Sequence, residues 1–347
     1  MTIEDLPPIA ERAAAPARLP DLPGGVGLTW RALTPEDVPA LFALVSVVEA
    51  TDNSPERSTE HEVGEKFTGS WRRPDLDLVA GFDTQGAIRA YAWSDFRPIE
   101  KGTLAPVLSG GVHPEYRRRG IGSALLAWSE ARARQQLAGA EANLPARIRM
   151  FTFDRHDGER ALAESAGFTA TRWYVDMRRD LSVPVPDIAL GDGIAIEVYS
   201  EPRRDDVRIT HNEAFVPDHW GSNPYDAEAW GLHAIGSEKF RPDWSFVAVD
   251  TATDRVVGYL LSGAYDQDWP AQGFTEGWTD LLAVRREWRR RGIAPALLAS
   301  AMRAYAADGM QYAGLDVDVD NPTGALGLYE NLGYERRGVS IEYSREI

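Results

Sequence analysis

Apolar positions that recur every three or four residues predict two long helices, one in each half of the chain. Each of these helices is expected to bury one face and to end at a glycine, near Gly139 and near Gly309. The apolar positions are Ile121, Leu125 and Trp128 in the first helix and Ile293, Leu297, Ala301 and Tyr305 in the second.

Short apolar runs predict the strands, and they occur in the same order in both halves. Each half opens with a strand and a helix, continues with a hairpin, and then has a strand that leads into the long helix. After that helix come another strand, a short helix and a closing strand. We therefore expect a mixed α/β fold in each half, with helices on both sides of a mixed sheet. The predicted hairpins are 78–82 with 88–93 and 246–249 with 256–262.

Matching segments recur at nearly constant separation, which indicates an internal duplication. The matched pairs are Tyr91 with Tyr259, Gly120 with Gly292, and Phe168 with Tyr334. The period is too long for a solenoid repeat, and 347 residues suit two domains of ordinary size. The expected division is a loose lead-in at 1–25, an N-terminal domain at 26–180, a proline-rich linker at 181–192 and a C-terminal domain at 193–347.

Composition narrows the possible functions. The net charge of −16 argues against a general nucleic-acid-binding surface, which needs a basic face. The chain has no cysteine, so disulfides and thiolate ligands are excluded, and its six scattered histidines predict no metal site. We expect no membrane segment and a cytoplasmic location.

A basic, glycine-containing turn precedes each long helix. It reads Arg117-Arg118-Arg119-Gly120-Ile121-Gly122 in the first half and Arg289-Arg290-Arg291-Gly292-Ile293-Ala294 in the second. Free backbone N–H groups and the helix dipole favour a phosphate at a helix N-terminus, and glycine permits close approach. The sequence therefore predicts two phosphate-binding turns.

Taken together, these features resemble the GNAT superfamily of acetyl-coenzyme A-dependent acyltransferases. The family turn, Arg/Gln-x-x-Gly-x-Gly/Ala, is matched by both copies. A second family mark, an Asn followed by an apolar helix, is matched by Asn321 and Leu328-Tyr329-Glu330-Asn331-Leu332-Gly333-Tyr334. The resemblance covers about 26–180 and 193–347 and implies two tandem GNAT domains. Asn321 and Tyr329 are eight residues apart, against the family's commoner seven, and we expect 322–324 to absorb the extra residue.

The resemblance implies acetyl-coenzyme A as the cofactor, with its pyrophosphate on the turn and its pantetheine arm along the preceding strand. The residues that it implies for binding share these two places or the position of the family Asn. They are Leu282, Ala283, Val284, Arg289, Arg290, Arg291, Gly292, Ile293, Ala294 and Asn321 in the second half, and Val112, Arg117, Arg118, Gly120 and Gly122 in the first.

The two halves differ in the residues that would carry catalysis. By resemblance Tyr329 is the general acid that protonates the departing thiolate. A carboxylate base must deprotonate the amine, and Glu276 and Asp280 lie on one face of the strand before the turn. The first half has Ala163 in place of the tyrosine and no acid on its equivalent strand. We therefore expect catalysis in the C-terminal half, with either carboxylate as the base.

The acceptor is expected to be a primary amine of a small molecule. Glu213, His219 and Trp220 lie where this fold binds its acceptor. The two-domain plan resembles the mycothiol synthases, and an aminoglycoside-type transferase is equally open. A non-catalytic acyl-coenzyme A sensor and a protein or peptide acetyltransferase are the alternatives, and the chain is expected to be a monomer or a homodimer.

Overall fold

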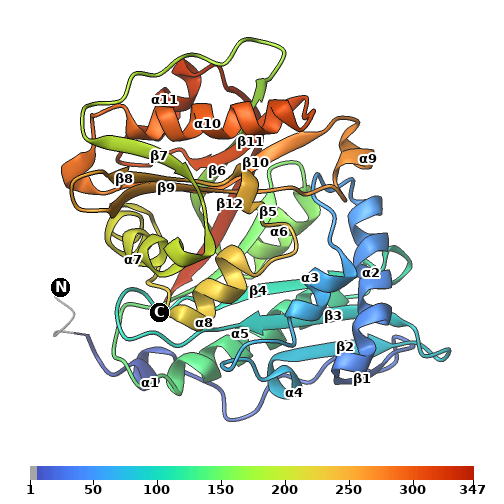
Figure 1. The fold of residues 1–347 in the computed structure, drawn as a ribbon. Coiled ribbons are helices and arrows are strands. Elements are labelled where there is room, and N and C mark those ends of the chain that lie inside the picture. The colour runs from blue at the N-terminus through green and yellow to red at the C-terminus, as the bar shows by residue number, and fades with distance from the viewer. Residues whose placement is uncertain (1–5) are drawn as a thin grey trace. The chain divides into compact units, whose positions relative to one another are not determined.

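The computed structural model describes residues 6–347, which divide into two compact units. Of the described residues, the first unit comprises 6–171 and 341–347, and the second comprises 172–340. Each unit is a mixed α/β fold, as the sequence predicts, and the elements are labelled in Figure 1.

The first unit contains five sequential strands in the order β1-β2-β3-β4-β5, continued by the end of β12 and the start of β6. The predicted hairpin is formed by β2 and β3, and β4 pairs antiparallel with β3. The elements are α1 Ile9–Arg12, β1 Thr29–Ala32, α2 Val38–Thr51, α3 Glu60–Glu65, α4 Pro74–Asp77, β2 Leu78–Phe82, β3 Ile88–Asp95, β4 Val107–Val112, α5 Ile121–Ala138, β5 Arg147–Phe153 and α6 Asp157–Ser165.

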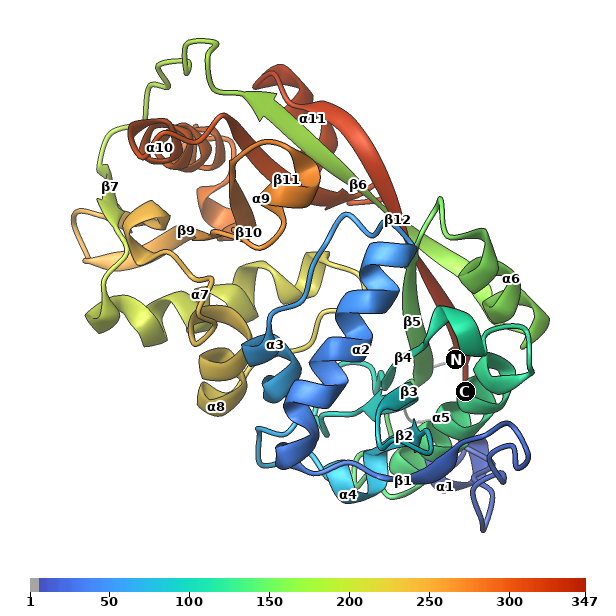
Figure 2. The ribbon, with the colours of Figure 1, turned by 90° about the vertical axis from the view of Figure 1, so that its right-hand side faces the viewer.

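Side chains that alternate in direction along β2 are buried on both faces of this sheet. On β2, Leu78 and Ala80 pack with α2, whereas Val79 between them packs with Ile121 and Trp128 of α5. Successive side chains of a strand point to opposite faces, so α2 and α5 must lie on opposite sides of these strands. Figure 2 shows the two helices in that arrangement.

The second unit repeats the plan with the order β6-β11-β10-β9-β8-β7. Parallel pairing joins β10 to β11, and β8 with β9 forms the second predicted hairpin. The elements are β6 Thr169–Asp180, β7 Ile194–Val198, α7 Arg204–Ala214, α8 Ala227–Trp230, β8 Phe246–Asp250, β9 Arg255–Gly263, α9 Trp269–Gln272, β10 Glu276–Val284, α10 Ile293–Ala307, β11 Tyr312–Asp318, α11 Ala325–Asn331 and β12 Glu335–Glu346.

The sheet of the second unit also has a helix on each face (Figure 1). Leu315 and Val317 of β11 pack with α10 in one buried cluster. Tyr259 and Leu261 of β9 pack with Val207 of α7 in another. The predicted apolar face of α10 lies in the first cluster. The odd-numbered residues of β11 therefore face α10, and the even-numbered ones point to the other side.

The compact units do not follow the boundaries expected from the repeat. Residues 172–180 of β6 and the expected linker 181–192 belong to the second unit, and 341–347 belong to the first. The reason is strand pairing, since β6 runs antiparallel to β11 from Tyr174↔Asp318 to Asp180↔Tyr312. The closing strand of the sequence's first half is thus a strand of the second unit's sheet.

The N-terminal segment 6–25 is more ordered than the loose lead-in that we expected. It contains α1, and Ile9 and Ala13 of this segment are buried. Arg12 donates hydrogen bonds to the carbonyl oxygens of Leu144 and Ile347 at 2.7 and 2.8 Å. The part of the expected lead-in that covers 1–5 lies outside the described residues.

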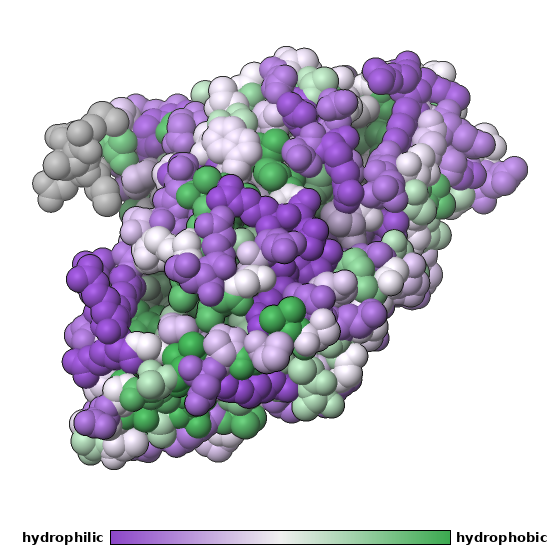
Figure 3. All heavy atoms as spheres, turned by 90° about the horizontal axis from the view of Figure 1, so that it is seen from above, coloured by the Kyte–Doolittle hydropathy of each residue, from purple (hydrophilic) through white to green (hydrophobic). Residues whose placement is uncertain are grey.

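Exposed side chains are mixed in character. On the face seen in Figure 3, hydrophilic side chains prevail and apolar ones lie in small groups among them. The large exposed apolar residues are scattered along the chain, as is normal for a protein surface. Within 6–347, no helix has the length and apolar character needed to cross a membrane.

Candidate active site

The two basic turns have the same backbone conformation. Arg118 and Gly120 have φ angles of 60° and 78°, and Arg290 and Gly292 have 62° and 77°. A left-handed conformation is costly for arginine, so its presence at the same place in both turns marks a shape held by its surroundings. Each turn delivers the chain into a helix of fifteen or more residues, whose first N–H groups are available to an anion.

The first arginine of each turn is used inside the fold. The Arg289 guanidinium donates to the Val284 carbonyl oxygen at 3.0 Å and to Asp218 at 2.6 Å. Through these contacts Arg289 fastens the turn to the strand before it and to the segment after α7.

Arg117 does the same in the first unit. Its Nε donates to the Val112 carbonyl oxygen at 2.9 Å, and its two terminal nitrogens form a bidentate pair with Asp52 at 2.6 and 2.8 Å. The guanidinium groups of both arginines thus have partners within the protein, and a role of either residue in cofactor binding stays a prediction. The arginines that follow in each turn are exposed at the surface: Arg118, Arg119, Arg290 and Arg291.

The central strands β4 and β10 are each paired with a parallel neighbour over only part of their length, and this pairing ends before the basic turn is reached. The recorded register between β10 and β11 ends at Thr279↔Leu315, although β10 continues to Val284. In the first unit, β4 pairs with β5 only at Val107↔Arg149. Among the described residues, the segment 282–284 and its counterpart up to Val112 therefore have no paired strand on one side. Backbone groups on that side suit an extended chain such as a pantetheine arm.

The start of α10 is more crowded than the start of α5. A Cβ at Gly292 would lie 2.8 Å from the Ala189 carbonyl oxygen, whereas a Cβ at Gly120 would meet nothing within 4 Å. Ile293 is buried beneath the turn, and Ala294 packs against the same core. In α5, Gly122 leaves room beside Leu162, 3.7 Å from where a Cβ would stand.

A β-bulge sets the direction of the Asp280 side chain. The pairing of β10 with β9 is regular up to Thr279↔Ser262 and resumes at Leu281↔Leu261, so Asp280 has no partner residue. The Thr279 hydroxyl lies 3.2 Å from that of Tyr305 on α10, while Leu281 packs with the α7 cluster. Asp280 lies on the α7 side as well, against the bare Cα of Gly263.

The Asp280 carboxyl is desolvated but retains some exposed surface. Burial raises its pKa to about 7, with a smaller rise from the charge of Asp316 and an opposing effect of the Tyr265 hydroxyl. That hydroxyl donates to Oδ1 of Asp280 at 2.7 Å. A carboxyl group with a pKa near neutrality is suited to accept and release a proton at physiological pH.

Glu276, the other candidate base, is committed elsewhere. Its carboxylate forms an ion pair with Arg178 of β6 at 2.8 Å and is buried. The Arg178 guanidinium also stacks over the ring of Phe274, at 3.9 Å from its centroid. The Glu276 carboxylate is therefore engaged by Arg178, whereas Oδ2 of Asp280 has no hydrogen-bond partner among the described residues.

Tyr329 lies on α11 with its ring almost fully buried. Burial raises the pKa of its hydroxyl, and within 6–347 this hydroxyl has no hydrogen-bond partner. Between Asn321 and α11, which begins at Ala325, the chain forms a turn that includes the residues expected to absorb the extra position. Asn321 Oδ1 accepts a hydrogen bond from the Thr323 N–H at 2.9 Å, and Gly324 has a φ of 73° at the N-cap.

His219 and Asn321, expected to bind the acceptor and the cofactor respectively, contact each other. The Asn321 Nδ2 lies 3.2 Å from His219 Nε2, and His219 Nδ1 lies 2.8 Å from the Phe215 carbonyl oxygen. These partners imply a neutral ring that donates through Nδ1, and burial lowers the pKa of His219 accordingly. Trp220 is partly exposed and lies under the guanidinium of Arg172, at 4.2 Å.

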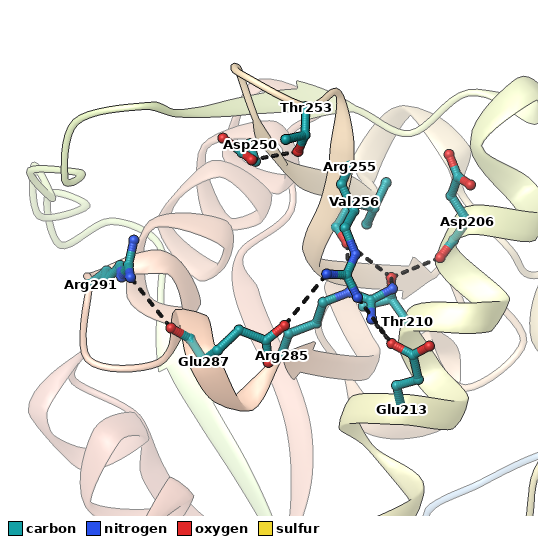
Figure 4. Close-up of polar contacts among 10 residues, drawn as sticks. All are labelled: Asp206, Thr210, Glu213, Asp250, Thr253, Arg255, Val256, Arg285, Glu287 and Arg291. Carbon is teal, nitrogen blue, oxygen red and sulfur yellow. Dashed lines mark hydrogen bonds and ion pairs between the residues drawn. The ribbon is translucent and has the colours of Figure 1, made fainter.

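Glu213 is placed in a cluster of charged side chains rather than beside Asp280. Figure 4 shows its carboxylate directed at Arg285, with which it forms an ion pair, and Arg255 approaches the same carboxylate at 3.3 Å. The buried Arg285 also donates to the Thr210 hydroxyl at 2.9 Å. This network joins α7 to the residue that follows β10, and Glu213 contributes to it as a structural ion-pair partner.

The first unit lacks the features that surround Asp280. Its strand β4 pairs with β3 continuously from Val107↔Asp95 to Val112↔Ala90, with no bulge. Ala163, which stands in the place of Tyr329, is fully buried.

Three acidic residues and one tyrosine of the site escaped the sequence analysis. Asp52 and Asp218 hold the turn arginines, and Tyr265 and Asp316 neighbour Asp280. The alternation Asp316-Val317-Asp318 was a readable signal, because it predicts carboxylates on one face of a strand. No sequence pattern marked Tyr265, which lies in the irregular segment after β9.

Comparison with known proteins then settles the family. The model of the acetyltransferase (GNAT) family matches residues 46–168 and 207–334, which is more than half of the chain. This chain belongs to the GNAT family. It is therefore an acyltransferase built from two tandem GNAT domains, with acetyl-coenzyme A as its cofactor.

Curated relatives and solved structures agree with this assignment. Mycothiol acetyltransferase of Gordonia bronchialis is 28% identical over 78% of this chain and 83% of its own length. Mycothiol acetyltransferase of Acidothermus cellulolyticus is 26% identical over 90% of this chain and 92% of its own.

Among structures, a GCN5-related N-acetyltransferase from Sphaerobacter thermophilus has a TM-score of 0.68 at 24% identity, with 94% of this chain and 97% of that chain covered. A tandem GNAT protein from the clavulanic acid biosynthesis pathway has a TM-score of 0.63 at 14% identity, with 92% and 98% covered. These structural likenesses bear on the fold.

The residues of the second unit fit acetyl-coenzyme A. The turn with left-handed Arg290 and Gly292 presents helix N–H groups, and exposed Arg290 and Arg291 add positive charge for phosphates. The unpaired side of 282–284 suits an extended arm. The Tyr329 hydroxyl is a donor that no group of residues 6–347 uses.

Proposed function

We propose that this protein transfers the acetyl group of acetyl-coenzyme A to a primary amine of a small molecule, and that the second unit carries out the reaction. The observation that carries the proposal is the bulge in β10, which holds a partly exposed carboxyl with a pKa of about 7 beside the end of the strand pairing. The first unit has neither the bulge nor an acid on β4.

Each of the two residues would move one proton. Asp280 would accept the proton from the attacking amine through Oδ2, because Oδ1 already accepts the Tyr265 hydroxyl. The cofactor supplies the acetyl group as a thioester. The Tyr329 hydroxyl would donate its proton to the departing sulfur, and burial of Tyr329 disfavours a lasting phenolate.

The face around Asp280 supports a cationic acceptor. Asp316 on the next strand points to the same face, since Leu315 and Val317 pack on the other. Asp316 is itself directly opposite Asp176 of β6. Carboxylates on neighbouring strands repel one another, so a bound ammonium group would relieve that repulsion. This is the reason to prefer an amine that arrives protonated and loses its proton in the site.

A mycothiol-type acceptor is the most specific candidate within this class. The names of the curated relatives support it, because their similarity extends over most of this chain and covers both halves. An aminoglycoside-type amine or a peptide amine is a competing acceptor. Family membership favours an enzyme over a coenzyme sensor.

For the first unit we propose a supporting role, with coenzyme binding at the turn around Gly120 but no catalysis. The predicted absence of nucleic-acid partners, the cytoplasmic location and the monomer or homodimer state stay predictions.

The test is acetyl-coenzyme A turnover, followed by thiol release, with a panel of small amines, a mycothiol-type amine and a peptide. Tyr329→Phe should lower kcat by roughly 100-fold or more, in the range typical of a lost general acid. Asp280→Asn should lower kcat/KM by a similar factor. Tyr334→Phe is the matched control, because Tyr334 packs against Tyr329 and its buried hydroxyl has no partner within the described chain.

Full activity of both Asp280→Asn and Tyr329→Phe would refute the proposed mechanism. Tight coenzyme binding without turnover of any amine would favour the sensor instead. Preference for the peptide over every small amine would refute the small-molecule assignment.

A further inference from the structure

The Asp280 carboxyl is held by a residue from outside the strand that carries it. Tyr265 follows β9, and its hydroxyl donates to Oδ1 of Asp280 at 2.7 Å. Gly263 makes this contact possible, since a Cβ there would lie 2.9 Å both from Oδ2 of Asp280 and from the Tyr265 ring. The absence of a side chain at Gly263 thus leaves the space in which the tyrosine and the carboxyl meet.

The hydrogen bond distinguishes the two carboxyl oxygens. Oδ1 accepts from Tyr265, while Oδ2 has no hydrogen-bond partner in the part of the chain that the structure describes. Because Asp280 is the extra residue of the bulge, its backbone has no partner residue on β9 to fix its direction. The tyrosine therefore supplies an anchor where the strand pairing gives none.

We propose that Tyr265 is a positioning residue for the reaction: it holds Oδ1 of Asp280 so that Oδ2 faces the acceptor amine, and with Asp316 it sets how readily this carboxyl ionises. This inference rests on the proposed role of Asp280 as the base. Tyr265 acts through Asp280 and need not touch the acceptor.

The two neighbours act in opposite directions. A hydroxyl that donates to the charged carboxylate stabilises it and lowers its pKa, whereas the negative charge of Asp316 raises that pKa. Burial raises it further and is the largest effect. The balance leaves a group that is still partly protonated near neutral pH, in contrast to an ordinary exposed aspartate.

Other titratable groups of the second unit lie close to this site or on the same face of the sheet. The Tyr305 hydroxyl on α10 is hydrogen-bonded to Ser262 and feels the Asp280 charge. Lys239 is paired with Asp266, next to Tyr265 in sequence, at 3.0 Å. The groups on these elements and on α7, besides Tyr265 and Asp316, include Tyr305, Lys239 with Asp266, Asp176, Glu276 with Arg178, Asp318, and His211 with Tyr259.

The first measurement is a direct titration of Asp280 by ¹³C NMR on the full chain labelled at aspartate carboxyl carbons. Asp280→Asn identifies the signal, and no substrate is needed. We expect a midpoint near pH 7 in the parent. Tyr265→Phe should move the midpoint up by about one pH unit, and Asp316→Asn should move it down by a similar amount.

The second measurement is the pH dependence of kcat/KM with acetyl-coenzyme A and the best amine of the panel. Its acidic limb should move up in Tyr265→Phe and down in Asp316→Asn, in step with the NMR midpoints. A merely structural role for Tyr265 would lower kcat/KM at every pH without moving the limb. Tyr312→Phe is the matched control, because Tyr312 lies on the same sheet and its hydroxyl has no hydrogen bond within residues 6–347.

The outcomes separate this inference from the function on which it rests. An unchanged or lowered midpoint in Tyr265→Phe would overturn the inference, whatever the activity. Should Tyr265→Phe not fold, Asp316→Asn still tests the balance, and a midpoint that does not fall would overturn it. Shifted midpoints together with a fully active Asp280→Asn would instead refute the proposed base and leave the tuning itself intact.

Discussion

Replacing Asp280 by Asn should stabilise the protein at alkaline pH, although it removes the proposed base. The folded pKa of about 7 lies above the ordinary value of 3.8, so ionisation of this carboxyl disfavours the folded state. The contribution of this carboxyl to the stability of the folded state is therefore fully present below pH 3.8. It is lost progressively as the pH rises from 3.8 through about 7. Asparagine has a similar shape, carries no charge and can still accept the Tyr265 hydroxyl through its carbonyl oxygen.

The magnitude follows from the pH interval. From pH 5.5 up to the folded pKa of about 7, an interval of roughly 1.5 pH units, the carboxyl is ionised in the unfolded state but protonated in the folded state. At about 1.4 kcal/mol per unit, the parent should lose about 2 kcal/mol that Asp280→Asn retains. This is an upper value, because the side chain keeps some exposed surface and solvent weakens the effect.

Urea unfolding at the two pH values measures this difference, with the transition of the second unit followed if the two units unfold separately. The exposed Asp192 offers the matched control, since Asp192→Asn should change stability equally at both pH values. If the advantage of Asp280→Asn were the same at pH 5.5 and pH 8.5, the carboxyl would not be desolvated in the folded state, and the reasoning about the base would fail with it.

Two further predictions compare equivalent positions in the two units. Gly120→Ala should cost about 1 kcal/mol of left-handed strain, whereas Gly292→Ala should cost at least about 2 kcal/mol in thermal unfolding, because its Cβ would also meet the Ala189 carbonyl oxygen; equal costs would contradict the crowding at α10. Asp218→Asn should raise the KM for acetyl-coenzyme A several-fold with little change in kcat, because it loosens the arginine that fastens the turn. Asp52→Asn in the first unit should leave both constants unchanged. A comparable effect of this change would contradict the assignment of catalysis to the second unit.

The elements of the fold were predictable where a periodic pattern determines them. Both long helices and both hairpins carry regular apolar positions, and the structure confirms them. The helix that carries Tyr329 begins at Ala325, because Asn321 and Thr323 form a turn and Gly324 adopts a left-handed conformation before it. Local turn chemistry decided that boundary, and periodicity could not.

The partners of charged side chains were the least predictable part of the site. Arg289 and Glu276 both stand where the sequence places functional groups, yet each is bound by a residue far away in the chain, Asp218 and Arg178 respectively. The alternation along a strand predicts the face on which a side chain lies, but it does not predict which residue of another strand will pair with that side chain. The pairing of β6 with β11, which places Arg178 in the second unit, crossed the boundary that the repeat suggested.

A single extra residue explains why similar units could differ in chemistry. In the first unit, Tyr91↔Gly111 and Asp95↔Val107 are separated by four residues on each strand. In the second, the five residues of β9 from Tyr259 to Gly263 face six residues of β10, from Ala283 back to Trp278. The extra residue is Asp280, which turns to the same face as Leu281 instead of alternating with it. The insertion thus places a carboxylate where the regular strand of the first unit has none. Deleting one residue at this point should restore regular pairing and remove the base together, whereas Asp280→Asn removes only the base.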